Sequence, residues 1–144
     1  MIIKKIDSSN ILPALDFSLN VFIKFNSSNY PDEGINLFKD SIFNSENINS
    51  REYFGAYIDN ILVGVIASNK DYSHISLLFV DGNYHKMGIG RQLFNKVKSL
   101  CIKNYITVNS SLYAYSFYKH LGFYDTCGMV CVKGFSFYPM RLDF

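Results

Sequence analysis

The strand residues Leu78-Phe79-Val80, followed by the loop His85-Lys86-Met87-Gly88-Ile89-Gly90-Arg91, decide the fold of this 144-residue chain. The run from 74 to 80 is apolar almost throughout, which is typical of a strand covered on both faces. After the loop, apolar residues recur at helical spacing from Gly90 to about Lys103. The sequence therefore predicts a strand, a short loop with glycines and a helix in direct succession.

A loop of this kind is suited to bind an anion. The first N–H groups of the helix have no partner within it, and the helix dipole is positive at that end. Glycines at 88 and 90 let the backbone approach a ligand closely, and Lys86 and Arg91 can add charge-assisted contacts to phosphate. A pyrophosphate is the natural occupant. Glycines also occur at strand-to-helix connections that bind no ligand, where they only allow the backbone to turn. Two other nucleotide signatures, Gly-x-x-x-x-Gly-Lys-Ser/Thr and Gly-x-Gly-x-x-Gly, do not occur.

The rest of the chain predicts an α/β sandwich around a mixed sheet. Asp59-Asn60 is expected to form a tight hairpin turn, and a polar loop through Asn49 should close the first helical part. Strands are expected at residues 2–6, 52–58, 61–68, 74–80 and 105–108, and as two strands that turn near Lys133-Gly134. Helices are expected from just after Ser9 to Phe25, at 32–43, at 90–103, and at 112–121 before Gly122.

Composition and charge narrow the possible functions. With 49% hydrophobic and 18% charged residues the chain has the composition of a globular protein. The net charge of +2 comes from scattered Lys and Arg, which gives little support to a nucleic-acid or membrane-surface role. The three cysteines lack the CxxC spacing of metal or redox sites, and no apolar run is long enough to span a membrane. We expect one domain over residues 1–144, a cytoplasmic location and no metal.

Two motifs, in the right order and distance, resemble those of the GNAT acyltransferases. In that family a strand is followed by Gln/Arg-x-x-Gly-x-Gly/Ala and a helix, which corresponds to residues 85–90 with His85 at the first position. A second motif places Ala, Tyr and Gly-Phe at four-residue intervals, as in Ala114, Tyr118 and Gly122-Phe123. The resemblance covers the chain from about Arg51 onward and is strongest to small bacterial acetyltransferases of the family.

The resemblance implies the GNAT fold, an α/β (α+β) architecture with about four helices. Its sheet is mixed, mostly antiparallel and six- to seven-stranded, and its fourth and fifth strands splay apart to hold the pantetheine arm of acetyl-CoA. The Val80 N–H would polarise the thioester carbonyl, and residues 86 to 91 would hold the pyrophosphate. Asn109 or Ser111 would hydrogen-bond the pantetheine. The implied cofactor-binding residues are Leu78, Phe79, Val80, His85, Lys86, Met87, Gly88, Ile89, Gly90, Arg91, Asn109 and Ser111.

The resemblance also suggests catalytic residues. Tyr118 matches the tyrosine that protonates the CoA sulfur, and its alternative is a core aromatic role. The family's frequent fifth-strand glutamate is replaced by Ile106, which cannot accept a proton. His74 could act as the base through Ser76 or water, or could simply face solvent at a strand end, with Glu52 and bulk water as competitors.

The implied activity is transfer of an acetyl group from acetyl-CoA to a primary amine of a small molecule or peptide, in a ternary complex. Tyr30 is a candidate substrate contact in an aromatic-lined mouth, and a homodimer is possible. Two alternatives stay open. One is a non-catalytic acyl-CoA-binding module, which Ile106 would suit, and the other is a relative by fold alone that serves as a protein-interaction partner.

Overall fold

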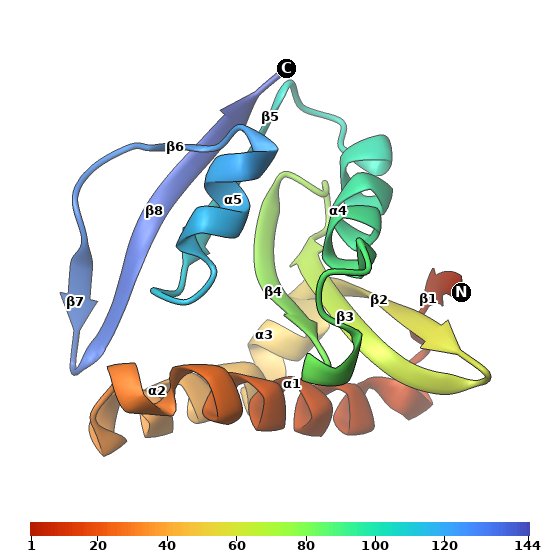
Figure 1. Cartoon of the computed structure of the whole chain (residues 1–144), viewed down its shortest axis with the longest axis horizontal. Helices are drawn as coiled ribbons and strands as arrows, with labels where there is room; N and C mark the ends of the chain where they lie inside the picture. The colour runs from red at the N-terminus through yellow and green to blue at the C-terminus, as the bar shows by residue number, and fades with distance from the viewer.

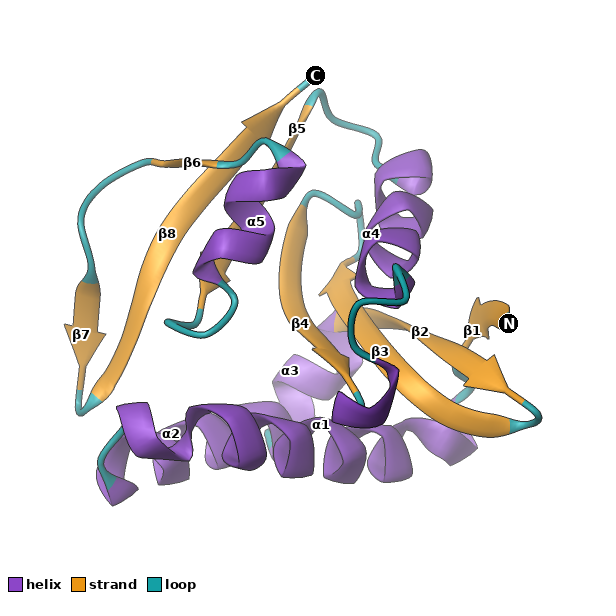
Figure 2. Ribbon diagram, viewed as in Figure 1, coloured by secondary structure: helices purple, strands orange, loops and turns teal.

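The computed structural model describes residues 1–144 and contains a mixed sheet with helices on both faces (Figures 1 and 2). The strands are β1 (Ile2–Lys5), β2 (Arg51–Ile58), β3 (Ile61–Asn69), β4 (His74–Val80), β5 (Tyr105–Ser110), β6 (Tyr124–Asp125), β7 (Val130–Val132) and β8 (Phe135–Asp143). The helices are α1 (Ile11–Asn26), α2 (Asp32–Phe43), α3 (Ser45–Ser50), α4 (Ile89–Leu100) and α5 (Tyr115–Leu121), with short 3-10 turns η1 (Ser8–Asn10), η2 (Ser27–Asn29) and η3 (Gly82–Tyr84). No helix combines the length and apolar character that a membrane crossing requires.

Several sequence-based expectations need correction. The sheet has eight strands rather than six to seven, because the short β6 also pairs with β8. The expected polar loop before Arg51 contains the helix α3, which begins after an Asn44 side chain that accepts a hydrogen bond from Asn47 N (3.1 Å). Helix α5 begins at Tyr115 rather than residue 112, and α4 ends at Leu100 rather than 103.

Strands β4 and β5 separate after a short parallel contact. Their pairing consists of His74 with Thr107 and Ile75 with Val108. Between β3 and β4 the register jumps at this same place, which leaves Ser76 as an extra residue in β4. A bulge of this kind bends a strand and increases its twist. The ribbons of β4 and β8, which pairs with β5, accordingly diverge toward the bottom of the view in Figure 2.

The bulge also divides the side chains of β4 between two hydrophobic cores. Ile75 packs into the core that contains residues of α4 and α5, whereas Leu77 packs into the core that contains residues of α1 and α2. In a regular strand two residues at this spacing would face the same side. Ile106, at the position where the resemblance implies a glutamate, is fully buried in the first core. The opening between β4 and β5 therefore lies between two packed layers.

Candidate active site

The loop before α4 presents a row of free backbone donors. Lys86 (φ 64°) and Gly88 (φ 79°) adopt left-handed conformations, and Gly88 is the N-cap of α4. The N–H groups of residues 86–91 donate to no backbone acceptor, and the first such bond is from Gln92 N to Gly88 O (3.0 Å). A Cβ at Gly88 would meet no atom within 4 Å. These donors therefore line open space at the positive end of a helix, as an anion site requires.

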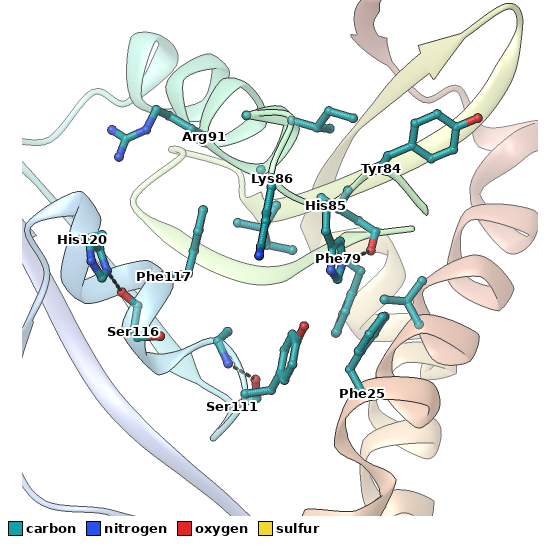
Figure 3. A pocket seen from close by; sticks show the side chains of 18 of the residues that line it. Phe25, Phe79, Tyr84, His85, Lys86, Arg91, Ser111, Ser116, Phe117 and His120 are labelled. Carbon is teal, nitrogen blue, oxygen red and sulfur yellow. Dashed lines mark hydrogen bonds between the residues drawn. The ribbon is translucent and has the colours of Figure 1, made fainter. Parts of the chain in front are cut away.

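A cleft of about 860 Å³ lies beside this loop. In Figure 3 the Lys86 side chain points toward the middle of the cleft, while Arg91 lies along its rim. Neither forms an ion pair within the protein, and no acidic residue lines the cleft. Its charge and its free donors fit a polyphosphate. The lining residues are Val21, Phe25, Asn26, Leu78, Phe79, Val80, Tyr84, His85, Lys86, Gly88, Ile89, Gly90, Arg91, Ser111, Tyr113, Ala114, Ser116, Phe117 and His120.

His85 fastens the loop to the end of β4. Its Nε2 donates to the backbone oxygen of Val80 (2.8 Å), which requires the proton on that nitrogen. Its ring also packs on Phe25 of α1, with ring centroids 4.8 Å apart. The side chain at this position thus contributes directly to the site, rather than the backbone alone.

The open edge of β4 offers backbone groups to an extended ligand. Asp81 N donates to Val63 O of β3 (2.9 Å). Because backbone groups alternate along a strand, those of Leu78 and Val80 face the opposite edge, toward β5. His85 occupies the Val80 oxygen, and the Val80 N–H stays available. Nearby, Asn26 is buried and lines the cleft, and its Oδ1 has no hydrogen-bond partner in the protein.

A second cavity of about 240 Å³ lies on the other side of the opening. It shares Leu78, Phe79, Ser111 and Ala114 with the larger cleft, so the two spaces adjoin each other at these residues. Among its other lining residues are Ser41, Arg51, His74, Ser76, Asn109, Tyr118 and Phe137. We call the larger space the donor cleft and the smaller one the acceptor cavity.

Tyr118 reaches the acceptor cavity from α5. Its side chain is 4% exposed, its hydroxyl has no hydrogen-bond partner in the protein, and burial raises the pKa of the phenol. The phenol therefore keeps its proton at neutral pH. The Tyr118 backbone oxygen accepts from Phe123 N (3.0 Å) after Gly122 turns the chain with φ 103°. This turn explains the Gly-Phe of the second motif, because the left-handed conformation favours glycine.

His74 lines the same cavity at the start of β4. Its Nδ1 lies 2.7 Å from Thr107 Oγ1 of β5. Burial, together with the nearby positive charge of Arg51, lowers the pKa of His74, so the imidazole is neutral at pH 7. The competing base, Glu52, is ion-paired with Lys5 (2.8 Å) and Lys70 (3.1 Å) and lines neither space.

Other residues expected in the site take different positions. Met87 is exposed and lines neither space, so its backbone N–H, which donates to no backbone acceptor, is the group that it can offer to a ligand. Asn109 lines the acceptor cavity alone, and Ser111 lines both spaces while its Oγ accepts from Ala114 N (3.1 Å).

Tyr30, the candidate substrate contact, is buried and lines neither space. Its hydroxyl donates to Ser136 O (2.8 Å), so it ties the α1–α2 connection to β8.

The structure also brings in residues that sequence reasoning missed. Phe25 stacks on Tyr113 with centroids 5.1 Å apart at the donor cleft, and His120 lines the same cleft. Asn26 and Arg51 each contribute a buried polar atom that has no partner. Only the folded sheet brings these positions together, and none carries a local motif.

Comparisons with known proteins agree with this geometry. A family model described as an acetyltransferase (GNAT) domain matches residues 26–144. A GCN5-related N-acetyltransferase from Rhodopseudomonas palustris superposes with a TM-score of 0.84 at 15% identity, covering 99% of this chain and 95% of that one.

Two further structures share the fold at low sequence identity. The PaiA N-acetyltransferase of Thermoplasma acidophilum, in complex with coenzyme A, superposes with a TM-score of 0.77 at 16% identity. The match covers 99% of this chain and 98% of that one. An aminoglycoside 6'-acetyltransferase type Ii superposes with a TM-score of 0.62 at 23% identity, and the match covers 99% of this chain and 97% of that one. No curated protein matches the chain in sequence. The match over residues 26–144 shows that the chain belongs to the GNAT acetyltransferase family.

Proposed function

We propose that this protein transfers the acetyl group of acetyl-CoA to a primary amine of a small molecule or peptide by direct attack in a ternary complex. One observation supports the proposal: a cleft with free backbone N–H donors and a cavity lined by His74 and Tyr118 adjoin where β4 and β5 separate. This arrangement would let an acyl donor and an amine approach each other from opposite sides and react without a covalent enzyme intermediate.

The donor cleft would hold acetyl-CoA, which supplies an acetyl group activated as a thioester. The N–H groups of residues 86–91 would bind the pyrophosphate, with Lys86 and Arg91 adding charge. The free edge of Leu78 and Val80 would pair with the pantetheine as an added strand does. The Val80 N–H would then polarise the carbonyl of the thioester.

His74 would accept the proton that the amine loses, and Tyr118 would donate a proton to the leaving sulfur. We assign the Nδ1–H tautomer to His74, because the Thr107 hydroxyl can then accept from it and donate to Ser73 O (3.4 Å). Nε2 is left to accept the amine proton as the C–N bond forms. As the C–S bond breaks, Tyr118 donates its phenolic proton to the sulfur. Both proton transfers thus involve residues that line the acceptor cavity.

The His74 assignment predicts a pH profile. Since the pKa of His74 is lowered below its usual 6.5, the base stays neutral at pH 7, and kcat/KM should fall only as the pH drops further below 6.5. His74→Asn should lower kcat/KM about 100-fold at neutral pH, the lower end of general-base effects, and should remove this acid limb. The measurement is kcat/KM from pH 5 to 8, corrected for ionisation of the amine.

His120→Asn is the matched control, since His120 lines the donor cleft and not the acceptor cavity. It should leave the acid limb in place. An unchanged acid limb in His74→Asn would show that another group accepts the proton.

Buried Ile106 favours one rival function, a non-catalytic acyl-CoA-binding module. The test is thiol release from acetyl-CoA across a panel of amines, together with the shift in thermal midpoint that acetyl-CoA causes. The proposal expects both amine-dependent thiol release and a raised midpoint. A raised midpoint without transfer to any amine would support the binding module. No shift at millimolar acetyl-CoA would contradict both.

A further inference from the structure

Arg51 places an unpaired positive charge against the acceptor cavity. It begins β2, lines the cavity, and its Nη1 is buried without a hydrogen-bond partner. No ion pair involves it, and no Asp or Glu lines the cavity. Burial lowers the pKa of Arg51, and the Tyr53 hydroxyl, a neighbour that can hydrogen-bond the guanidinium and has no other partner, partly offsets this. The guanidinium therefore borders the cavity without an acidic partner in the protein, and an anionic ligand group in the cavity would supply one.

The same end of the sheet holds Arg51 beside His74. Arg51 pairs with Asn69 in the β2–β3 ladder. The Asn69 side chain in turn accepts from the backbone N–H groups of Ser73 (2.9 Å) and His74 (3.0 Å). These contacts fix the backbone of Arg51 and the backbone of His74 relative to each other. Both side chains line one cavity of about 240 Å³, less than the ~300–1,000 Å³ of sites for drug-sized ligands.

We infer that the acceptor is a small amine that carries a carboxylate, of the amino-acid type, and that Arg51 binds its carboxylate while His74 faces its amine. This rests on the proposed acetyl transfer at the same site. A guanidinium pairs with a carboxylate through two parallel hydrogen bonds, which would give Arg51 the anionic partner that the protein does not supply. A polycationic acceptor would place further positive charge beside Arg51, with no acidic side chain to offset it.

Matched amine pairs test this inference: L-alanine with ethylamine, L-leucine with isopentylamine, and L-phenylalanine with phenethylamine. For the preferred pair, wild-type kcat/KM should be about 10- to 100-fold higher for the member with the carboxylate, as expected for a charged hydrogen-bonded contact. Arg51→Gln should reduce this ratio to within about threefold, chiefly through a higher KM for the amino acid. Arg51→Lys should keep part of the ratio, because lysine keeps the positive charge but cannot form the two parallel hydrogen bonds of a guanidinium.

Arg141→Gln serves as the control, since Arg141 is an arginine of β8 that pairs with Asp143 and lines neither space. Its ratio should match that of the wild type. The Arg51→Gln protein is expected to fold with an unchanged or higher thermal midpoint, because the substitution removes a partly buried charge that has no acidic partner. Equal kcat/KM within every pair, or a ratio that Arg51→Gln leaves intact, would overturn the inference.

A binding measurement separates this inference from the proposed function. The thermal midpoint is measured in the presence of CoA, with each amino acid and with its decarboxylated partner, and needs no turnover. If no amine is acetylated but an amino acid raises the midpoint of the wild type and not of Arg51→Gln, the carboxylate site stands and the transfer proposal fails. If amines are acetylated with no preference for the carboxylate, the transfer proposal stands and the carboxylate site fails.

Discussion

Replacing Tyr118 with phenylalanine is expected to lower kcat about 100- to 1,000-fold, as the loss of a general acid does. The hydroxyl is the one polar group of this side chain, and burial raises its pKa, so it holds its proton through the neutral range. Without it the thiolate must leave unprotonated. The KM for acetyl-CoA should change little, because Tyr118 lines the acceptor cavity and not the donor cleft. Steady-state kinetics with the best amine of the panel give both constants.

Tyr115→Phe is the matched control on the same helix. Its hydroxyl donates to Asp125 (3.0 Å), and Tyr115 lines neither space, so turnover should be close to that of the wild type. Tyr118→Phe should also fold normally, since the lost hydroxyl has no partner in the protein and the ring keeps its contacts with Phe117 and Phe123. An undiminished kcat in Tyr118→Phe would remove Tyr118 from the mechanism.

The second large effect is on stability. Gly34→Ala is expected to destabilise the protein by about 2–3 kcal/mol, the upper part of the range for overpacking. In a helix, alanine is normally better than glycine by about 0.5–1 kcal/mol. Here a Cβ would overlap the backbone oxygen of Gly134 at the β7–β8 turn, where no side chain can rotate away. The clash should therefore outweigh the propensity, and the thermal midpoint should fall by about 5–10 °C.

Gly128→Ala provides the comparison. A Cβ there meets no atom within 4 Å, and Gly128 does not have a positive φ, so its midpoint should be unchanged or slightly higher. A stable Gly34→Ala protein would mean that α2 can move away from the β7–β8 turn without cost. Phe38 of α2 and Phe137 of β8 both line the acceptor cavity, so such freedom would also loosen its walls.

The donor side of the site could be predicted from the sequence because its parts are local. The apolar strand, the two glycines and the helix are contiguous, and a positive φ at Gly88 and free N–H groups follow from that order. Tyr118 could be placed because Gly122 must end its helix one turn later. Met87 shows the limit of this reasoning, since a motif position does not tell which way its side chain points.

The acceptor side could not be predicted, because it depends on contacts between distant segments. Arg51 reaches the cavity through the pairing of β2 with β3, and Tyr30 is drawn into the core by a hydrogen bond to Ser136, which lies 106 residues along the chain. The resemblance supplied the splay of β4 and β5, but its cause here, the extra residue Ser76, is visible only in the register. Helix α3 was missed because its sequence, Ser-Glu-Asn-Ile-Asn-Ser, has the polar composition of a loop.

The most direct test is a crystal structure of the protein with CoA and its preferred amine. The pyrophosphate oxygens should accept hydrogen bonds from N–H groups of residues 86–91, the sulfur should lie within reach of the Tyr118 hydroxyl, and the amine should lie in the acceptor cavity beside His74. A pyrophosphate bound away from this loop, or a sulfur that does not reach the opening between β4 and β5, would contradict the account.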